Sequence, residues 1–215
     1  MIGPVMIGPS SSHTAGAARI GFAARQLLNH TPTLARFQLH GSFAATGKGH
    51  ATDRALLAGV LGDAPDSELL SQSFARAREA GLEFHFSSID LGEEAHPNTA
   101  IVHLTGGLRH VSLTAASVGG GMIAVTEIDR HPVSIQGSRS TLVCWHADHP
   151  GFLSALTTLF AEVSFNIASI STNRKTRGGA ALTVVEADET IPPELARRAE
   201  SIPGLARLCL LRPLP

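Results

Sequence analysis

The stretch STLVCWHADHPGFLSALTTLFAEV, residues 140–163, decides the fold. Its first seven residues are mostly β-branched or apolar, which predicts a strand. Asp148 is suited to cap a helix, and Pro150 is suited to its first turn. Apolar side chains then recur at helical spacing and form one stripe, made of Phe152, Leu153, Leu156, Leu159, Phe160 and Val163. We therefore expect a strand that is followed directly by a helix.

The sequence after this stretch completes a small unit. Its predicted elements are a strand (165–172), a hairpin turn (175–179), a strand (180–187), a short helix (192–201) and a last strand (206–211). The order βαββαβ is that of a ferredoxin-like unit. Because the pattern changes near residues 129–138, we expect two domains, residues 1–137 and residues 138–215.

The N-terminal region is a less regular mixture of helices and strands. A helix is predicted over residues 15–28, with Ile20, Ala23, Ala24, Leu27 and Leu28 as its buried stripe. The other predicted elements are a strand through Phe37, Leu39, Gly41 and Phe43, helices at 51–61 and 68–80, and strands at 83–87, 100–104, 109–114 and 122–128. Antiparallel strands with helices on one face indicate the α+β class.

Composition excludes several classes of protein. With 43% hydrophobic and 16% charged residues, a packed core is expected and disorder is not. The net charge of −1 lacks the basic footprint of a nucleic-acid binder. No run approaches the roughly 18 apolar residues of a membrane helix, and the first residues do not have the pattern of a signal peptide. We expect a cytoplasmic protein whose partners are small molecules or other proteins.

The two cysteines, Cys144 and Cys209, lie in short apolar runs that predict strands. Buried reduced thiols are therefore expected. Two cysteines cannot supply the four thiolates of an all-cysteine zinc or iron–sulfur site, and no histidine pair has the spacing of a metal-binding helix. We expect no metal site in this chain.

A first polar motif is IGPSSSHTAG, residues 7–16. Its hydroxyl groups and His13 lie where a helix begins, and the unpaired backbone N–H groups there attract a carboxylate or a phosphate. His13 could hold such an anion or move a proton. Ordinary capping by one serine is the alternative, although it accounts for only one of the hydroxyls.

A second motif is GSFAATGKGHATD, residues 41–53. It is similar to a phosphate-binding loop, but five residues separate Gly41 from Gly47, and Gly49 follows Lys48, so the nucleotide-binding pattern fails. A turn that exposes Thr46, Lys48, His50 and Asp53 remains. The alternative is that Asp53 only caps the helix and that Lys48 is only solvated.

Two shorter polar segments complete the candidates. Residues 96–99, His-Pro-Asn-Thr, precede a strand and by pattern alone indicate a plain turn. The loop at residues 146–151, with Asn166 on the next strand, could bind the ammonium and carboxylate of an amino acid through Asp148. The alternative is that Asp148 only caps.

These motifs carry a resemblance to two known families. Residues 141–211 resemble an ACT domain, through Asp148-x-Pro150-Gly151, Asn166-Ile167 and the hairpin from Arg174 to Gly179. Residues 3–137 resemble the beta chain of bacterial iron–sulfur L-serine dehydratase, through residues 7–14, residues 47–53 and His96-Pro97-Asn98-Thr99. The N-terminal fold also resembles the allosteric substrate-binding domain of some phosphoglycerate dehydrogenases.

The resemblance implies a partner alpha chain that supplies cysteines to a [4Fe–4S] cluster, and deamination of L-serine to pyruvate and ammonia. Iron would activate the hydroxyl leaving group, and the protein would supply a base and hold the carboxylate. Family members usually have a few residues before this start, so the first strand is expected to be clipped or the start codon misplaced. Self-association through the ACT or the beta domain is also expected.

The implied roles divide the candidate residues into three groups. His13 and His50 are expected to transfer protons. L-serine is expected to be bound by Ser10, Ser11, Ser12, Thr14, Lys48 and Asp53. The resemblance also implies an allosteric site that senses serine, with His146, Asp148 and Asn166 as its binding residues.

Two other readings stay open. The chain could be a non-catalytic amino-acid-sensing regulatory protein, although regulation by an ACT domain does not need the two polar loops before Ala51. It could also be a ligand-binding fragment of a phosphoglycerate dehydrogenase, but no G-x-G-x-x-G fingerprint lies between a strand and a helix.

Overall fold

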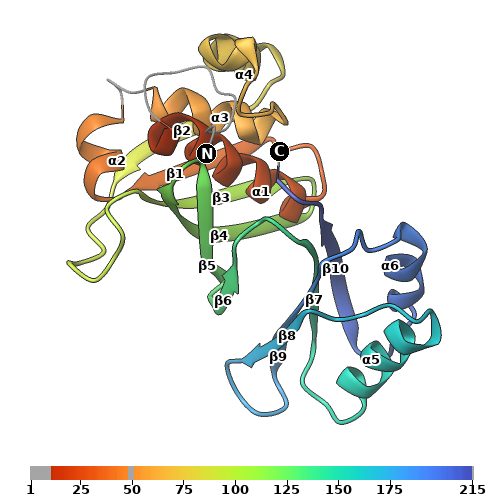
Figure 1. The fold of residues 1–215 in the computed structure, drawn as a ribbon. Helices are drawn as coiled ribbons and strands as arrows, with labels where there is room; N and C mark the ends of the chain where they lie inside the picture. Colours follow the sequence, from red (N-terminus) through yellow and green to blue (C-terminus); the bar gives the residue numbers. More distant parts are fainter. Residues whose placement is uncertain (1–10, 48–50, 215) are drawn as a thin grey trace. The chain divides into compact units, whose positions relative to one another are not determined.

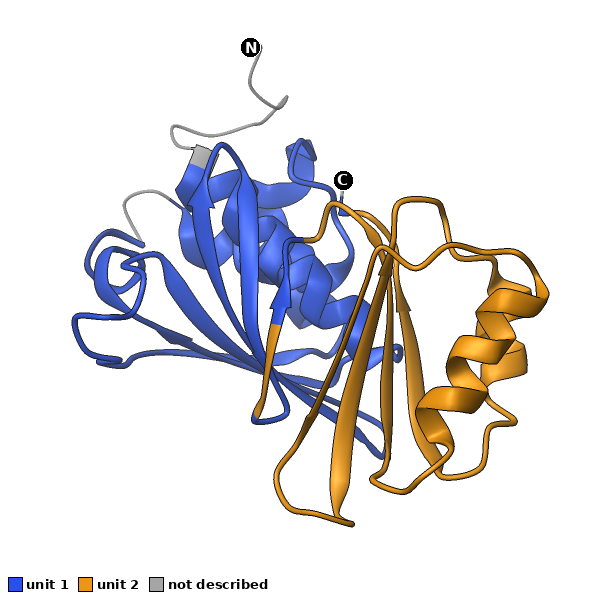
Figure 2. Ribbon diagram, turned by 60° about the horizontal axis from the view of Figure 1, so that its bottom comes forward, with its two compact units in different colours: residues 1–130, 134–136, 214–215 blue, residues 131–133, 137–213 orange. Residues whose placement is uncertain are grey.

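The computed structural model describes residues 11–47 and 51–214, with only the backbone of Ser11. The chain divides into two compact units (Figure 2). The first comprises residues 1–130, 134–136 and 214–215, and the second comprises residues 131–133 and 137–213. Each unit is described by itself below.

The first unit is a six-stranded sheet with helices against it (Figure 1). Its helical elements are a π-helical turn (Ser11–Gly16), α1 (Ala17–Leu28), α2 (Gly41–Thr46), α3 (Thr52–Leu61), a 3₁₀ turn (Glu68–Gln72) and α4 (Ser73–Glu79). Its strands are β1 (Leu34–Leu39), β2 (Glu83–Ser88), β3 (Thr99–Gly106), β4 (Arg109–Gly119) and β5 (Met122–Ile128), and the sheet ends with β6 (His131–Ile135), of which residues 131–133 are assigned to the second unit.

The strand order is β2-β1-β3-β4-β5-β6. β1 is parallel to β2, whereas the β1–β3, β3–β4 and β4–β5 pairs are antiparallel. Side chains alternate across β1, so that Ala35, Phe37 and Leu39 are buried while Arg36 is exposed. The sheet therefore has one apolar face, against which the helices pack, and one polar face.

Helices α1 and α3 approach each other at glycines. A Cβ atom on Gly21 would overlap the carbonyl oxygen of Leu56, and one on Gly59 would overlap that of Ala18. Only glycine permits this distance between the two backbones. The stripe predicted on the first helix, from Ile20 to Leu28, is buried.

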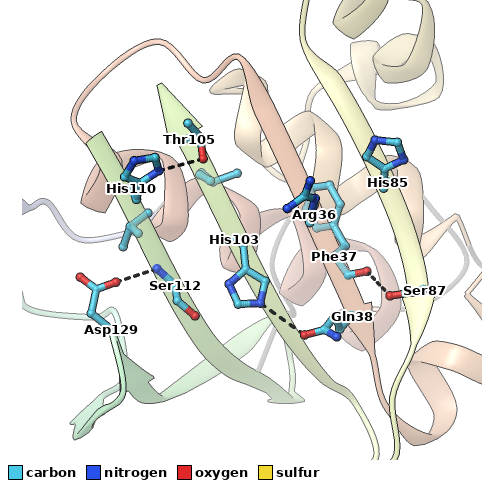
Figure 3. Close-up of a pocket in the computed structure, with 12 residues that line it drawn as sticks. Arg36, Phe37, Gln38, His85, Ser87, His103, Thr105, His110, Ser112 and Asp129 are labelled. Atoms are coloured by element: carbon cyan, nitrogen blue, oxygen red, sulfur yellow. Dashed lines mark hydrogen bonds between the residues drawn. The ribbon is translucent and has the colours of Figure 1, made fainter. Parts of the chain in front are cut away.

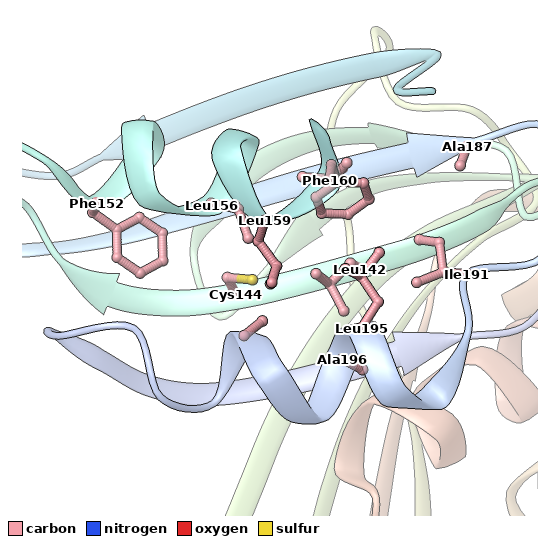
Figure 4. Close-up of a cluster of buried hydrophobic side chains, with 12 residues drawn as sticks. Leu142, Cys144, Phe152, Leu156, Leu159, Phe160, Ala187, Ile191, Leu195 and Ala196 are labelled. Atoms are coloured by element: carbon pink, nitrogen blue, oxygen red, sulfur yellow. The ribbon is translucent and has the colours of Figure 1, made fainter. Parts of the chain in front are cut away.

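The second unit confirms the predicted βαββαβ order. Its elements are β7 (Ser140–Ala147), α5 (Phe152–Glu162), β8 (Ser169–Arg174), β9 (Ala180–Ala187), α6 (Pro193–Ala199) and β10 (Leu205–Leu211). The sheet order is β10-β7-β9-β8, and all its pairs are antiparallel. Leu142 and Cys144 of β7 pack with Phe152, Leu156 and other side chains of the two helices in one buried cluster (Figure 4). None of the helices in the described parts of the chain is long and apolar enough to cross a membrane.

The structure corrects several predicted elements. The strand expected to continue through Gly41 and Phe43 ends at Leu39, because the chain turns at Gly41 (φ +55°) beside Pro97 and enters α2. The helix predicted over residues 68–80 is a 3₁₀ turn followed by a short helix. β6 was not predicted, because residues 129–137 were interpreted as a boundary.

A further correction concerns the start of α5. Asp148 does not cap it: the residue at the cap position is Gly151, with φ +97° and no side-chain hydrogen bond. Likewise, the N-cap position of α3 is Ala51, so Asp53 does not occupy it.

Candidate functional site

His13 lies in the π-helical turn before α1, with a partly buried side chain. Its Nε2 atom is 3.1 Å from the Oγ of Ser42 and 3.2 Å from the Oγ1 of Thr46. The ring also meets Phe43 edge-on, with centroids 5.4 Å apart. The first polar motif thus contacts the second through one imidazole.

The hydrogen bonds of Thr46 indicate the tautomer of His13. The Thr46 hydroxyl donates to the carbonyl oxygen of Ser42 at 2.9 Å, so its oxygen is left to accept from His13. This favours a proton on Nε2 and places the lone pair of the neutral ring on Nδ1. An imidazole in this state has the form of a general base.

A closed ring of contacts joins four distant segments around His13. The second motif meets the third, because the N–H of Phe43 donates to Pro97. The third motif meets β4, because the N–H of Ser117 donates to Asn98 at 3.0 Å. β4 returns to the first motif, since a Cβ atom on Gly16 would lie 2.7 Å from that of Ser117. The fold therefore brings together three polar motifs that are far apart in sequence.

Buried oxygen atoms without hydrogen-bond partners lie on this ring. Within the described residues they are Oγ1 of Thr14, Oγ1 of Thr52, Oγ of Ser117 and Oδ1 of Asn98. Thr14 is 2% exposed, and both Thr52 and Ser117 are fully buried. An unpaired buried polar group costs about 1–3 kcal/mol, so such a concentration needs a reason. Hydroxyl and amide oxygens of this kind are suited to a small, strongly polar ligand.

The other predicted residues of this site are placed as follows. Ser10, Lys48 and His50 lie outside the described residues, and of Ser11 only the backbone is described. Ser12 is partly buried in the π-helical turn. Asp53 lies in the first turn of α3, where its Oδ1 accepts the backbone N–H of Arg54. Their roles in binding and proton transfer stay predictions.

Sequence reasoning missed four residues of the ring. Ser42 and Thr52 lie inside the second motif but were not singled out, and Asn98 lies in a segment that indicated only a turn. Ser117 stands in a β-strand two residues before Gly119, and nothing in its local pattern marks it. Its position emerges only when β4 is paired with β3.

In the second unit, Asp148 is held by its own hairpin. Its Oδ2 accepts from the guanidinium of Arg174 at 2.7 Å and from the N–H of Gly178 at 2.9 Å. The Gly178 N–H and the Arg174 guanidinium hold the pKa of Asp148 below its usual value. The loop therefore contacts the hairpin at residues 174–179, and Asp148 has a role other than capping.

His146 is buried, and both of its ring nitrogens are engaged. Nδ1 is 2.8 Å from the carbonyl oxygen of Ala147, and Nε2 is 2.8 Å from the hydroxyl of Thr183. The ring stacks on Phe152 at 3.7 Å, and burial lowers its pKa. Asn166 is exposed between α5 and β8. Ligand binding at His146, Asp148 and Asn166 stays a prediction.

The residues of this chain do not fit an iron–sulfur cluster. Cys144 and Cys209 are both buried, on β7 and β10 of the second unit. Burial raises the pKa of Cys144 to about 12, whereas a cluster is ligated by thiolates. Within the described residues, no three His, Cys, Asp or Glu side chains are grouped so that they could hold a metal ion.

Comparison with known proteins agrees with both units. The family model of the serine dehydratase beta chain matches residues 2–128, and that of the ACT domain matches residues 140–204. The L-serine dehydratase beta chain of Peptoniphilus asaccharolyticus is 36% identical over 91% of this chain and 88% of its own length. The probable L-serine dehydratase beta chain of Bacillus subtilis is 35% identical over 97% of this chain and 94% of its own length.

A more distant similarity involves the D-3-phosphoglycerate dehydrogenase of Synechocystis, which is 25% identical over 60% of this chain but only 23% of its own length. The two beta-chain relatives, in contrast, match almost end to end. The resemblance predicted from the polar motifs is confirmed. This chain belongs to the serine dehydratase beta chain family and carries an ACT domain after the beta-chain domain.

Proposed function

We propose that this chain is the beta subunit of an iron–sulfur L-serine dehydratase, an L-serine ammonia-lyase that works with a cluster-bearing alpha subunit in the cytoplasm. The observation that carries the proposal is the ring around His13, with its buried, unpaired oxygens on Thr14, Thr52, Asn98 and Ser117. The beta-chain names of the relatives support the subunit role and imply an alpha partner.

The reaction sets two requirements for the protein. Loss of the α-proton and of the hydroxyl group turns L-serine into water and an enamine, which becomes an imine and is hydrolysed to pyruvate and ammonia. A base must take the α-proton, and polar groups must hold the carboxylate and the ammonium. We assign the proton transfer to Nδ1 of His13, together with His50, in line with the tautomer favoured by Thr46.

Substrate holding is assigned to the hydroxyl-rich turn and its surroundings. Hydroxyl groups of Ser10, Ser11, Ser12 and Thr14 are suited to the carboxylate, and the carboxylate of Asp53 is suited to the ammonium. Lys48 supplies a cation for the carboxylate. A [4Fe–4S] cluster would come from the alpha subunit, because the cysteines of this chain are buried in the other unit.

The ACT domain is proposed as the serine-sensing part, with the functional boundary at Gly137. A ligand at Asp148 would compete with Arg174 and the Gly178 N–H for its carboxylate. Binding at this loop would therefore be coupled to the conformation of the β8–β9 hairpin. Self-association through either domain would bring a second such loop to the assembly.

The test is anaerobic co-expression with a cysteine-bearing alpha chain, followed by measurement of iron and of pyruvate released from L-serine. We expect the complex to be active, His13→Ala to lose about a hundredfold or more in kcat, and His30→Ala, an exposed control, to keep its activity. Serine turnover by this chain alone would overturn the two-subunit proposal. Iron binding and serine binding by a complex that makes no pyruvate would favour a pure amino-acid sensor.

A further inference from the structure

A row of polar side chains crosses the face of the six-stranded sheet that the helices leave open. His85 of β2 pairs with Arg36 of β1, Arg36 pairs with His103 of β3, and His103 pairs with Ser112 of β4. Their exposed or partly exposed side chains lie on the opposite side of β1 from buried Phe37 (Figure 3). One arginine thus stands between two histidines on a flat β platform.

This row lines a hollow of about 520 Å³ within the first unit. Gln38, Ser87, Thr105 and His110 surround the row, and Asp129 lies at its far side beside Ser112. The hollow is large enough for a small metabolite. It shares none of its lining residues with the ring around His13.

The imidazoles of the hollow are oriented by neighbouring side chains. Nε2 of His103 is 3.3 Å from Oε1 of Gln38, and Nε2 of His85 is 2.7 Å from Oε1 of Glu83. These contacts leave Nδ1 of both rings without a hydrogen bond to the described residues. Nδ1 of each ring is therefore open to a ligand on either side of Arg36, and a bound anion would favour the protonated ring in which Nδ1 donates.

The centre of the hollow is positively polarised. The guanidinium of Arg36 makes no hydrogen bond or ion pair with a described residue, so its donors remain available. Burial, together with the nearby charges of Arg36 and Arg130, lowers the pKa of His103. The carboxylate of Asp129 is engaged by the backbone N–H of Ser112 at 2.8 Å, on the β4 side of the hollow. The part of the hollow at Arg36 therefore favours a negatively charged ligand.

We propose that this hollow binds the oxyanion of a small metabolite, a carboxylate or a phosphate group, on Arg36 with His85 and His103 beside it. The planar guanidinium presents paired donors that match such a group. The site is separate from the proposed catalytic ring, so that the beta-chain domain has a ligand site of its own in addition to the ACT domain.

The test is a titration of the full chain with inorganic phosphate and, separately, with acetate at constant pH and ionic strength. The ring signals of His85 and His103 are followed by ¹H–¹³C NMR and assigned with His85→Gln and His103→Gln. We expect saturable shifts of both signals. Arg36→Gln should weaken binding by about tenfold or more, since a charge-assisted hydrogen bond is lost. Arg177→Gln, an exposed arginine of the other unit, is the matched control and should bind as the wild type.

The comparison of the two anions identifies the ligand class. Tighter phosphate binding supports a phosphate-bearing ligand, and equal or tighter acetate binding supports a carboxylate. Linear, unsaturated shifts with both anions overturn the proposal. Equal binding by Arg36→Gln and the wild type overturns it as well, provided that circular dichroism shows the variant to be folded. Neither result bears on serine turnover, which tests the other site.

Discussion

A Cβ atom added to Gly16 would overlap Oγ of Ser117 and lie 2.7 Å from its Cβ. Gly16, the residue before α1, therefore packs directly against the Ser117 side chain of β4. This contact closes the ring of segments around His13 and places the Ser117 hydroxyl against the first polar motif.

Because of this close contact, we expect the effect of Gly16→Ala on the free energy of unfolding to depend on the residue at position 117. Gly16 has helical angles (φ −63°, ψ −41°), so alanine alone would stabilise the chain by about 0.5–1 kcal/mol. In the wild-type background, where Ser117 is present, we expect Gly16→Ala to lower the free energy of unfolding by about 1–3 kcal/mol, the usual cost of overpacking. In a Ser117→Gly background the same change should be neutral or stabilising, as measured by urea unfolding. An equal loss in both backgrounds would show that the contact is not the cause.

Ser117→Ala is expected to separate stability from activity. Removal of a buried, unpaired hydroxyl should leave the free energy of unfolding unchanged or raise it by about 1 kcal/mol. Pyruvate formation by the reconstituted complex should nevertheless fall about tenfold or more, since a charge-assisted hydrogen bond to substrate would be lost. Ser154→Ala, on the exposed face of α5, is the control. Full activity of Ser117→Ala would remove this hydroxyl from the site.

The ion pair of Asp148 predicts a pH dependence of stability. Its pKa in the folded chain lies below the ordinary value of 3.8, so its contribution to the free energy of unfolding is present above pH 3.8 and is lost as pH falls through the lower folded value. The difference in unfolding free energy between wild type and Asp148→Asn should be constant from about pH 7 to pH 5 and should shrink below pH 3.8. Denaturant unfolding at each pH measures it. A difference that grows on acidification contradicts the assignment.

The two thiols should be unreactive in the folded chain. Cys144 and Cys209 are 0% and 2% exposed, and the pKa of Cys144 is raised to about 12. At pH 8 we expect negligible labelling by a disulfide reagent in native buffer and labelling of both thiols in denaturant. Rapid native labelling would show that a thiol can reach a ligand, and it would reopen the assignment of the cluster to a partner.

The second unit follows closely from the sequence, whereas the polar site does not. The sequence predicted β7 and β9 because they are nearly continuous runs of buried apolar and β-branched residues, and it predicted the helix α5 because its apolar residues recur at helical spacing. At Gly41 the period failed: Phe43 continues the alternation of β1, yet it is buried from a helix. Local periodicity cannot distinguish these cases, because the contact with Pro97 that turns the chain is distant in sequence.

Some residues of the candidate site could likewise be predicted from the sequence, and others could not. His13 and Thr14 were predicted because they lie in an unusual run of hydroxyl-bearing residues. Ser117 and Asn98 were not, because a single serine in a strand and an asparagine in a turn are ordinary. Their significance depends on which segments the sheet register places next to each other, and this information is absent from any short stretch of sequence.

The glycine contact between α1 and α3 has a consequence for the durability of the site. The first polar motif continues directly into α1 and the second into α3, and these helices meet backbone to backbone at Gly21 and Gly59. Contacts between main-chain atoms thus set the distance between these two motifs, and the size of the surrounding apolar side chains matters less. Apolar core residues can therefore be substituted while the distance between the two motifs is kept. One added methyl group at either glycine, in contrast, would push the two helices apart and so displace both motifs.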